Sequence, residues 1–268
     1  MELLGSMENI AKAKSEILEN LSAENLAVLN NDDKFVSKMT TGARTVTYGI
    51  IKNSAVQAKN IKISGSGTTF TYVSKITGKE QNVTTPLIGE HNVMNALAAI
   101  CVAESYGVED EKIAAALAEI VMTEKRQELV HFADYTVIND AYNASPASME
   151  AACKTLHKVV EGQKRGRAVA VLSDMLELGE NSTDAHTRVG NYVADADVKL
   201  LITYGEEARA ISSAAAKRGV EIVHVANKEA AAHQLKKLLQ PGDVILFKGS
   251  HSMQVDKVIE MVFKGDKN

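Results

Sequence analysis

From Tyr135 to the end of the chain, short apolar runs rich in β-branched residues alternate with longer helical stretches. This alternation is typical of a parallel sheet, because every parallel connection must cross back over the sheet and a helix does so compactly. The runs predict strands at 136–139, 168–172, 200–203, 221–225 and 244–247, with helices near 147–160, 183–194, 206–217, 228–239 and 253–263. We therefore expect an α/β fold in which this half forms a doubly wound, mostly parallel, Rossmann-like sheet domain.

The first half has a less regular pattern. It predicts a helix near 7–21, strands at 26–30, 56–64, 68–74 and 81–85, and helices near 92–106 and 110–121. Gly65-Ser66-Gly67 predicts a hairpin turn between two of these strands. Because this half opens abruptly with a helix and has few buried strands, we expect an incomplete domain. The polar stretch 123–127 is the predicted linker and divides the chain into domains at 1–124 and 125–268.

The composition is that of a folded chain that works away from membranes and nucleic acids. A length of 268 residues fits two domains, and 30 Lys and Arg against 34 Asp and Glu leave no basic surplus for a nucleic acid or an anionic membrane. Cys101 and Cys153 both lie in Ala-rich helical patterns, so neither a disulfide framework nor a metal cluster is expected. The first twenty residues lack the layout of a secretory signal, which together with the cysteines favours the cytoplasm.

Polar residues follow three of the predicted strands in the second half. The first strand is followed by Asp140, Tyr142, Asn143 and Ser145, the second by Asp174, and the last by Lys248, Gly249 and Ser250. Because parallel strands place their carboxyl ends at one edge of a sheet, these residues predict a site for a polar, charged substrate there. Alternatively, Ser145-Pro146 is only a helix cap and Gly249-Ser250 only a tight turn, although capping does not explain Lys248 or Asp140.

Lys14 lies in an apolar stripe of the first predicted helix. Ile10, Lys14, Ile17 and Leu21 are spaced four, three and four residues apart, so they share one face. A lysine in a buried stripe must snorkel, lower its pKa or be chemically changed, and a neutral lysine can add carbon dioxide to become a carbamate that ligates a metal. The spacing by itself favours snorkelling over function.

Asn92 and Asn95 share one face of a second predicted helix, whose core stripe is formed by Val93, Leu97 and Ile100. A pair of carboxamides matches the donor and acceptor at the N6 and N7 edge of adenine. A role of Asn92 as the N-cap of the helix is equally supported. No G-x-x-x-x-G-K-[ST] phosphate-binding motif occurs in the sequence.

These motifs together resemble the Mur ligase family. The matching strings are GSMENIAKAKSEI, AVLNNDD, LIGEHNVMNALAAI, EKRQE, VINDAYNASPASMEAA, VLSDMLELGENSTDAH and VILFKGSHSM, which occur in the family's order over nearly the whole chain. The resemblance implies an ATP- and Mg²⁺-dependent amide ligase of cytoplasmic peptidoglycan precursor synthesis. DAYNASPASM together with DMLELG implies that the ligase joins D-alanyl-D-alanine to UDP-N-acetylmuramoyl-tripeptide.

The resemblance also implies roles for individual residues. Lys14 is similar to the family's carbamylated lysine, a magnesium ligand, and with Arg126 and Lys248 makes up the expected catalytic set. Nucleotide-binding roles are implied for Asn92 and Asn95 at adenine, Arg126 at phosphate, Asp140 at the ribose, and Tyr142 and Asn143 beside them. Substrate contacts are implied for Ser145, Asp174, Lys248, Gly249 and Ser250. His186 matches a family position without an assigned chemical role.

The sequence departs from the family pattern at its beginning. The uridine-nucleotide-binding domain and the glycine-rich phosphate loop of the central domain have no counterpart in it. We therefore expect this polypeptide alone to be inactive, and its incomplete central domain to favour association. The alternative is a non-catalytic module that binds ligand or pairs with a partner carrying the loop. A folate-type polyglutamate ligase shares the fold, but is not expected to contain both DAYNASP and DMLELG.

Overall fold

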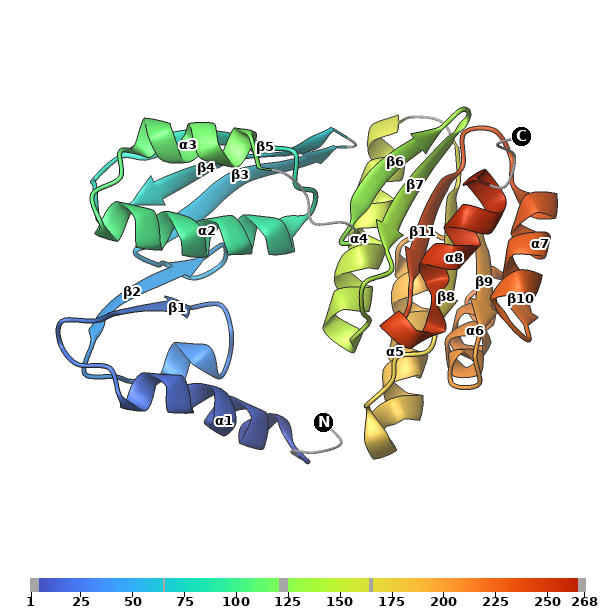
Figure 1. Cartoon of the computed structure of the whole chain (residues 1–268), viewed down its shortest axis with the longest axis horizontal. Helices are drawn as coiled ribbons and strands as arrows, with labels where there is room; N and C mark the ends of the chain where they lie inside the picture. The colour runs from blue at the N-terminus through green and yellow to red at the C-terminus, as the bar shows by residue number, and fades with distance from the viewer. Residues whose placement is uncertain (1–4, 65, 121–124, 164–165, 265–268) are drawn as a thin grey trace. The chain divides into compact units, whose positions relative to one another are not determined.

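The computed structural model describes residues 5–64, 66–120, 125–163 and 166–264 and divides the chain into two compact units, residues 1–121 and 122–268 (Figure 1). The predicted linker lies partly outside the described residues. Among the described residues, no helix combines the length and apolar character that crossing a membrane requires. Cys101 and Cys153 are free and buried.

The second unit is the predicted doubly wound α/β domain. Its sheet has the order β10-β9-β8-β11-β7-β6, and every neighbouring pair is parallel except β6 and β7. The strands are β6 (Glu128–Phe132), β7 (Tyr135–Asp140), β8 (Ala168–Ser173), β9 (Leu200–Tyr204), β10 (Glu221–Val225) and β11 (Val244–Lys248). The five predicted strands are confirmed. The sequence analysis missed β6, a half-exposed edge strand that immediately follows the predicted linker.

Helices cover both faces of this sheet. They are α4 (Pro146–Gln163), α5 (Ser182–Asp195), α6 (Ala208–Ala216), α7 (Lys228–Leu238) and α8 (Val255–Ile259), the last continued by a π-helical turn η4 (Glu260–Lys264). Helices α4, α5 and α6 lead the chain through β8, β9 and β10 in one direction, and α7 leads it back to β11. Right-handed crossovers in opposite directions place their helices on opposite faces, as Figure 1 shows for α5 and α7.

The packing of this sheet explains its continuous apolar strands. Every residue of β8, β9 and β11 is buried, because helices lie above and below the sheet. The core includes Val169, Ile202 and Phe247, all fully buried. The direction of the connections changes around β11, so the carboxyl end of this strand lies at the point where sheets of this kind bind their ligands.

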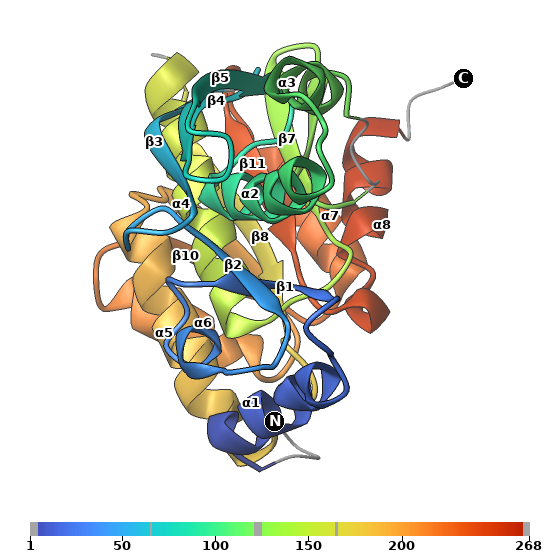
Figure 2. The same cartoon turned by 90° about the vertical axis from the view of Figure 1, so that its left-hand side faces the viewer.

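The first unit contains α1 (Met7–Glu19), a five-stranded sheet, α2 (Glu90–Ser105) and α3 (Asp110–Ala118). The sheet order follows the chain, through β1 (Leu26–Asn30), β2 (Arg44–Gly49), β3 (Val56–Ser64), β4 (Gly67–Ser74) and β5 (Glu80–Thr85). The first three strands are parallel and the last three antiparallel. Helix α2 packs across β1, β2 and β3, and α3 packs on β5 (Figures 1 and 2).

Two predictions for this unit need comment. Gly65 of the predicted hairpin turn lies outside the described residues, while Ser64 and Gly67 on either side of it pair across β3 and β4. Strand β2 was missed, because in Arg44–Gly49 apolar and polar residues alternate over too short a run. The predicted core stripe of α2 is confirmed, with Val93, Leu97 and Ile100 fully buried.

The part of the predicted apolar stripe that holds Lys14 and Ile17 is not the buried face of α1. Lys14 is exposed, and Ile17 in the same stripe keeps 77% of its surface exposed. The helix instead buries Leu18, which packs against Ala27 and Leu29 of β1. One turn before Leu18, the half-buried residue on α1 is Ser15. Because serine is small and polar, this face does not stand out as an apolar stripe in the sequence. Lys14 is therefore not seated among buried apolar side chains.

Candidate active site

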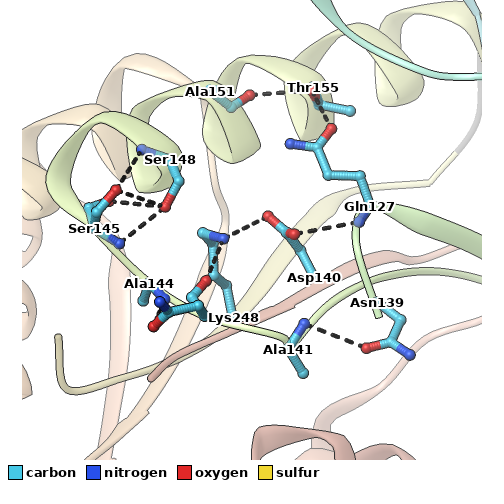
Figure 3. A network of polar contacts seen from close by, with 11 residues as sticks. Gln127, Asn139, Asp140, Ala141, Ala144, Ser145, Ser148, Ala151, Thr155 and Lys248 are labelled. Atoms are coloured by element: carbon cyan, nitrogen blue, oxygen red, sulfur yellow. Dashed lines mark hydrogen bonds and ion pairs between the residues drawn. The ribbon is translucent and has the colours of Figure 1, made fainter. Parts of the chain in front are cut away.

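Asp140 and Lys248 form a buried ion pair at the carboxyl edge of the second sheet. Strands β7 and β11 are neighbours in a register that pairs these two residues, so their side chains leave the sheet at the same level. The Nζ of Lys248 lies 2.6 Å from Oδ2 of Asp140 (Figure 3). It donates a second hydrogen bond, 2.9 Å long, to the carbonyl oxygen of Asn143. Lys248 is only 2% exposed, so water does not screen this pair.

The second oxygen of Asp140 binds the start of β6. Oδ1 accepts a hydrogen bond of 3.2 Å from the backbone nitrogen of Gln127, whose side-chain oxygen accepts from Thr155 of α4 at 3.0 Å. Burial raises the pKa of Asp140, and the charge of Lys248 opposes this shift. Both oxygens of Asp140 are thus engaged, and Lys248 holds this carboxylate and the following loop in place.

Arg126 and Tyr142 form an exposed stack beside the ion pair. The guanidinium carbon of Arg126 lies 3.9 Å from the ring centroid of Tyr142, and the backbone nitrogen of Tyr142 donates to the carbonyl oxygen of Lys125. Lys125 and Gln127 have φ values of 60° and 51°, in the left-handed region that ordinary residues disfavour by about 1 kcal/mol or more each. The backbone is therefore strained on both sides of Arg126, where it presents this arginine at the surface.

His251 lies beside this stack, although it was given no role among the predicted site residues. Its ring centroid lies 6.3 Å from that of Tyr142, and the side chain is exposed. The available signal was its position directly after Ser250, within the polar segment that follows β11. The exposed part of the rim thus combines a guanidinium, a phenol and an imidazole, three groups that bind anions and aromatic rings.

Asp174 connects the loop after β8 to two neighbouring loops. Its Oδ1 accepts a hydrogen bond of 2.8 Å from the backbone nitrogen of Ala208 at the start of α6, and its carbonyl oxygen accepts from Ser250 at 3.0 Å. Gly205 makes room for the carboxylate, because a Cβ at this position would lie 2.3 Å from Oδ1. A Cβ on Gly249 would likewise lie 2.9 Å from that of Ser173. Asp174 is thus a cap and a loop anchor.

The structure answers the question of helix capping for Ser145 and Asn92. Ser145 caps α4, since its Oγ accepts from the backbone nitrogen of Ser148 at 3.3 Å and its own nitrogen donates to Ser148 Oγ at 2.9 Å (Figure 3). Asn92 is not an N-cap, because Gly89 occupies that position. Its Nδ2 donates to the carbonyl of Ile88, and Asn95 donates to its Oδ1 at 3.4 Å. The two carboxamides share one face of α2.

The described residues do not form a metal site by themselves. Across the described ranges, no three His, Cys, Asp or Glu side chains come together in a way that would hold a metal ion. Lys14, the predicted carbamate, lies exposed on α1. The described residues thus supply no ready-made set of three such ligands for the expected Mg²⁺.

Two domain families of one class of enzyme match successive parts of the chain. Residues 1–103 match the Mur ligase middle domain, and residues 125–251 match the Mur ligase, glutamate ligase domain. The chain belongs to the Mur ligase family, as its motifs predicted.

The individual relatives have one name in common. The chain is 34% identical over 263 residues to the UDP-N-acetylmuramoyl-tripeptide–D-alanyl-D-alanine ligase of Bacillus subtilis (strain 168), covering 97% of this chain and 56% of the relative. The ligase of the same name from Escherichia coli (strain K12) is 34% identical over 266 residues, again covering 97% and 56%. A crystal structure of MurF from Acinetobacter baumannii matches 96% of this chain and 56% of its own with a TM-score of 0.81 and 25% identity. The chain thus spans little more than half the length of these proteins.

Proposed function

We propose that this chain contributes the part following the phosphate loop to an ATP-dependent amide ligase of peptidoglycan precursor synthesis. The complete ligase joins D-alanyl-D-alanine to UDP-N-acetylmuramoyl-tripeptide in the cytoplasm. The observation that carries the proposal is the carboxyl edge of the second sheet, where Asp140, Asn143 and Lys248 are joined by hydrogen bonds beside the exposed Arg126. The shared name of the relatives supports the choice of substrates.

The chemistry of the reaction explains why such an edge is needed. A carboxylate is a poor electrophile, so ATP first phosphorylates the terminal carboxylate of the tripeptide to an acyl phosphate. The amine of D-alanyl-D-alanine attacks the acyl carbon, phosphate leaves, and ADP is released. Magnesium, which the family resemblance implies, would offset the negative charge of the phosphates when bound. The polypeptide has to hold several anionic groups close together and orient the amine.

The nucleotide half of the proposal rests on two exposed residues, Asn95 and Arg126, and on the buried Asp140. Asn95 is exposed on α2 and continues the carboxamide face begun by Asn92, which suits an adenine edge. Arg126 is exposed and already oriented by the ring of Tyr142, which suits a phosphate. Asp140 is assigned to the ribose and Asn143 to the loop beside it. Because Lys248 occupies one oxygen of Asp140, a ribose hydroxyl has to share this carboxylate with the lysine.

In the substrate half of the proposal, several residues expected to contact the dipeptide act indirectly. Lys248 is buried and paired, so it acts on the dipeptide through the Asn143 loop instead of reaching it directly. Ser145 and Asp174 use their oxygens to cap helices, and Ser250 Oγ accepts from the backbone of Leu176. These residues, together with Gly249, shape the edge on which the dipeptide is proposed to lie. Lys14 as a catalytic carbamate depends on parts of a magnesium site that the described residues do not supply.

Turnover and complementation test this proposal. We expect no ADP release from ATP, UDP-N-acetylmuramoyl-tripeptide and D-alanyl-D-alanine by this polypeptide alone. Mixing it with a polypeptide that carries the phosphate loop and first domain of the Bacillus subtilis relative should restore release that depends on both substrates. Arg126→Met should remove the restored activity, whereas the matched surface change Arg218→Met should not. Robust turnover without the added polypeptide contradicts the expected inactivity.

A second candidate function is a non-catalytic binding module, which the engaged state of Lys248 and Asp140 favours. In that case the chain binds ADP or the dipeptide, but the complementing polypeptide restores no ADP release. Calorimetric titration with each ligand, run beside the complementation assay, separates the two functions.

A further inference from the structure

His186 is fully buried in α5, and both of its ring nitrogens have hydrogen-bond partners. Nδ1 lies 2.8 Å from the carbonyl oxygen of Ser182, a group that only accepts, so Nδ1 carries a proton. Nε2 lies 2.9 Å from the backbone nitrogen of Met175, a group that only donates, so Nε2 has to keep its lone pair. The two contacts together require a neutral imidazole protonated at Nδ1.

The partner of Nε2 lies in the middle of the loop that follows β8. The residue before Met175 accepts from Ser250 through its carbonyl oxygen at 3.0 Å, and the residue after it, Leu176, donates to Ser250 Oγ at 2.9 Å. Met175 is buried, so its backbone N–H has to be paired within the protein. His186 thus holds the middle of the loop that Ser250 holds at the two adjoining residues.

The surroundings of His186 resemble a nucleophile and base only superficially. Ser182 Oγ lies 3.3 Å from Nδ1 and donates to Glu207 at 2.7 Å, which brings a serine, a histidine and a carboxylate together. A histidine that activates a serine needs a free acceptor nitrogen facing the hydroxyl. Here the acceptor nitrogen is Nε2, which is occupied by the Met175 amide, and the ring has no exposed surface. The geometry therefore assigns His186 no part as a base.

We infer that His186 is a positioning residue, whose Nε2 holds the backbone N–H of Met175 and thereby keeps the loop after β8 in register with Ser250 at the edge proposed to bind the dipeptide. The part of this inference that concerns the dipeptide rests on the proposed function; the part that concerns the loop does not. The hydrogen bond from Met175 to His186 joins the loop after β8 to helix α5. Replacing His186 therefore affects this loop without altering any residue in the loop itself.

Three variants of the full chain test the inference. His186→Gln places an amide oxygen near the position of Nε2 and keeps an acceptor, whereas His186→Leu removes it. His233→Leu, on the exposed side of α7, is the matched control. The first measurement is the ¹⁵N chemical shifts of the His186 ring at neutral pH. We expect a protonated Nδ1 and a bare Nε2; a protonated Nε2 overturns the inference.

The second measurement is hydrogen exchange at the backbone amides of Met175 and Leu176. His186→Leu should speed exchange at Met175 by about tenfold or more, because a buried N–H loses its acceptor, and the glutamine variant should stay within a few-fold of the wild type. Exchange in the leucine variant that matches the wild type overturns the inference. If the leucine variant does not fold, the ¹⁵N chemical shifts of the His186 ring and the exchange rates of the glutamine variant test the inference.

A titration with D-alanyl-D-alanine completes the test. The leucine variant should bind the dipeptide about tenfold more weakly than the wild type, and the glutamine and His233 variants should bind it normally. If the exchange results are as expected but no variant binds the dipeptide, the loop assignment holds and the proposed dipeptide site is refuted. If all variants bind it equally, the inferred effect of the loop on the edge is refuted.

Discussion

Lys248→Met tests the buried ion pair on which the candidate site is built. Methionine keeps the apolar stem of the side chain and removes the ammonium, so among the described residues Asp140 retains Gln127 as its hydrogen-bond partner. Removing one member of a buried pair typically costs about 3–5 kcal/mol, because the remaining charge is left without compensation. The carboxylate can escape by taking up a proton, which at about pH 7 limits the electrostatic part of the cost to roughly 4 kcal/mol.

We therefore expect Lys248→Met to lower the free energy of unfolding of the second unit by about 3 kcal/mol at neutral pH, and its melting temperature by roughly 10 °C. The loss should depend on pH with a definite sign. Burial already raises the pKa of Asp140, and removing Lys248 raises it further. A group whose pKa is raised in the folded state loses its stabilising contribution as the pH rises through that pKa. The deficit of the variant should therefore be smaller at about pH 5 than at about pH 7.

Thermal and urea unfolding followed by far-ultraviolet circular dichroism measure this deficit, since the chain contains no tryptophan. The double variant Asp140→Asn with Lys248→Met is the matched control. It leaves no buried charge and should recover most of the lost stability. A single variant within about 1 kcal/mol of the wild type at neutral pH would refute the reasoning. A double variant as unstable as the single one would refute it equally.

Three further predictions concern single side chains. Ser145→Ala removes the cap of α4 and should cost about 1 kcal/mol in thermal unfolding, with an unchanged melting temperature counting against the cap. Gly205→Ala forces a Cβ against the Asp174 carboxylate at a φ of 105°, and should cost about 2–4 kcal/mol; a cost below about 1 kcal/mol contradicts the close contact. Burial, with the neighbouring Asp110 carboxylate, raises the pKa of Glu104 to about 7. The raised pKa lies above the ordinary value of 4.5, so protonated Glu104 stabilises the first unit fully below about pH 4.5. This stabilisation is lost as the pH rises through about 7. Glu104→Gln should reduce this pH dependence, and a variant with the same slope as the wild type argues against the shift.

The strand and helix pattern of the second unit could be predicted because each element carries its own periodic signal. Strands such as Ala168–Ser173 are buried on both faces and therefore read as continuous apolar runs. Their carboxyl ends meet at one edge, so the sequence was enough to group Asp140, Asp174 and Lys248. Strands β2 and β6 were missed, because a half-exposed strand next to a loop has too weak an alternation to stand out.

The residues at the ends of the strands and the family that they resemble could be predicted from the sequence, because both depend on the order of residues along the chain. What those residues contact follows from the tertiary structure. Lys14 is exposed because a different face of its helix packs on β1, and Lys248 is engaged because a neighbouring strand brings Asp140 to it. His186 is held in one tautomer by two backbone groups, one of them eleven residues away. Such contacts depend on which elements become neighbours, and that outcome is set by the packing of the whole unit.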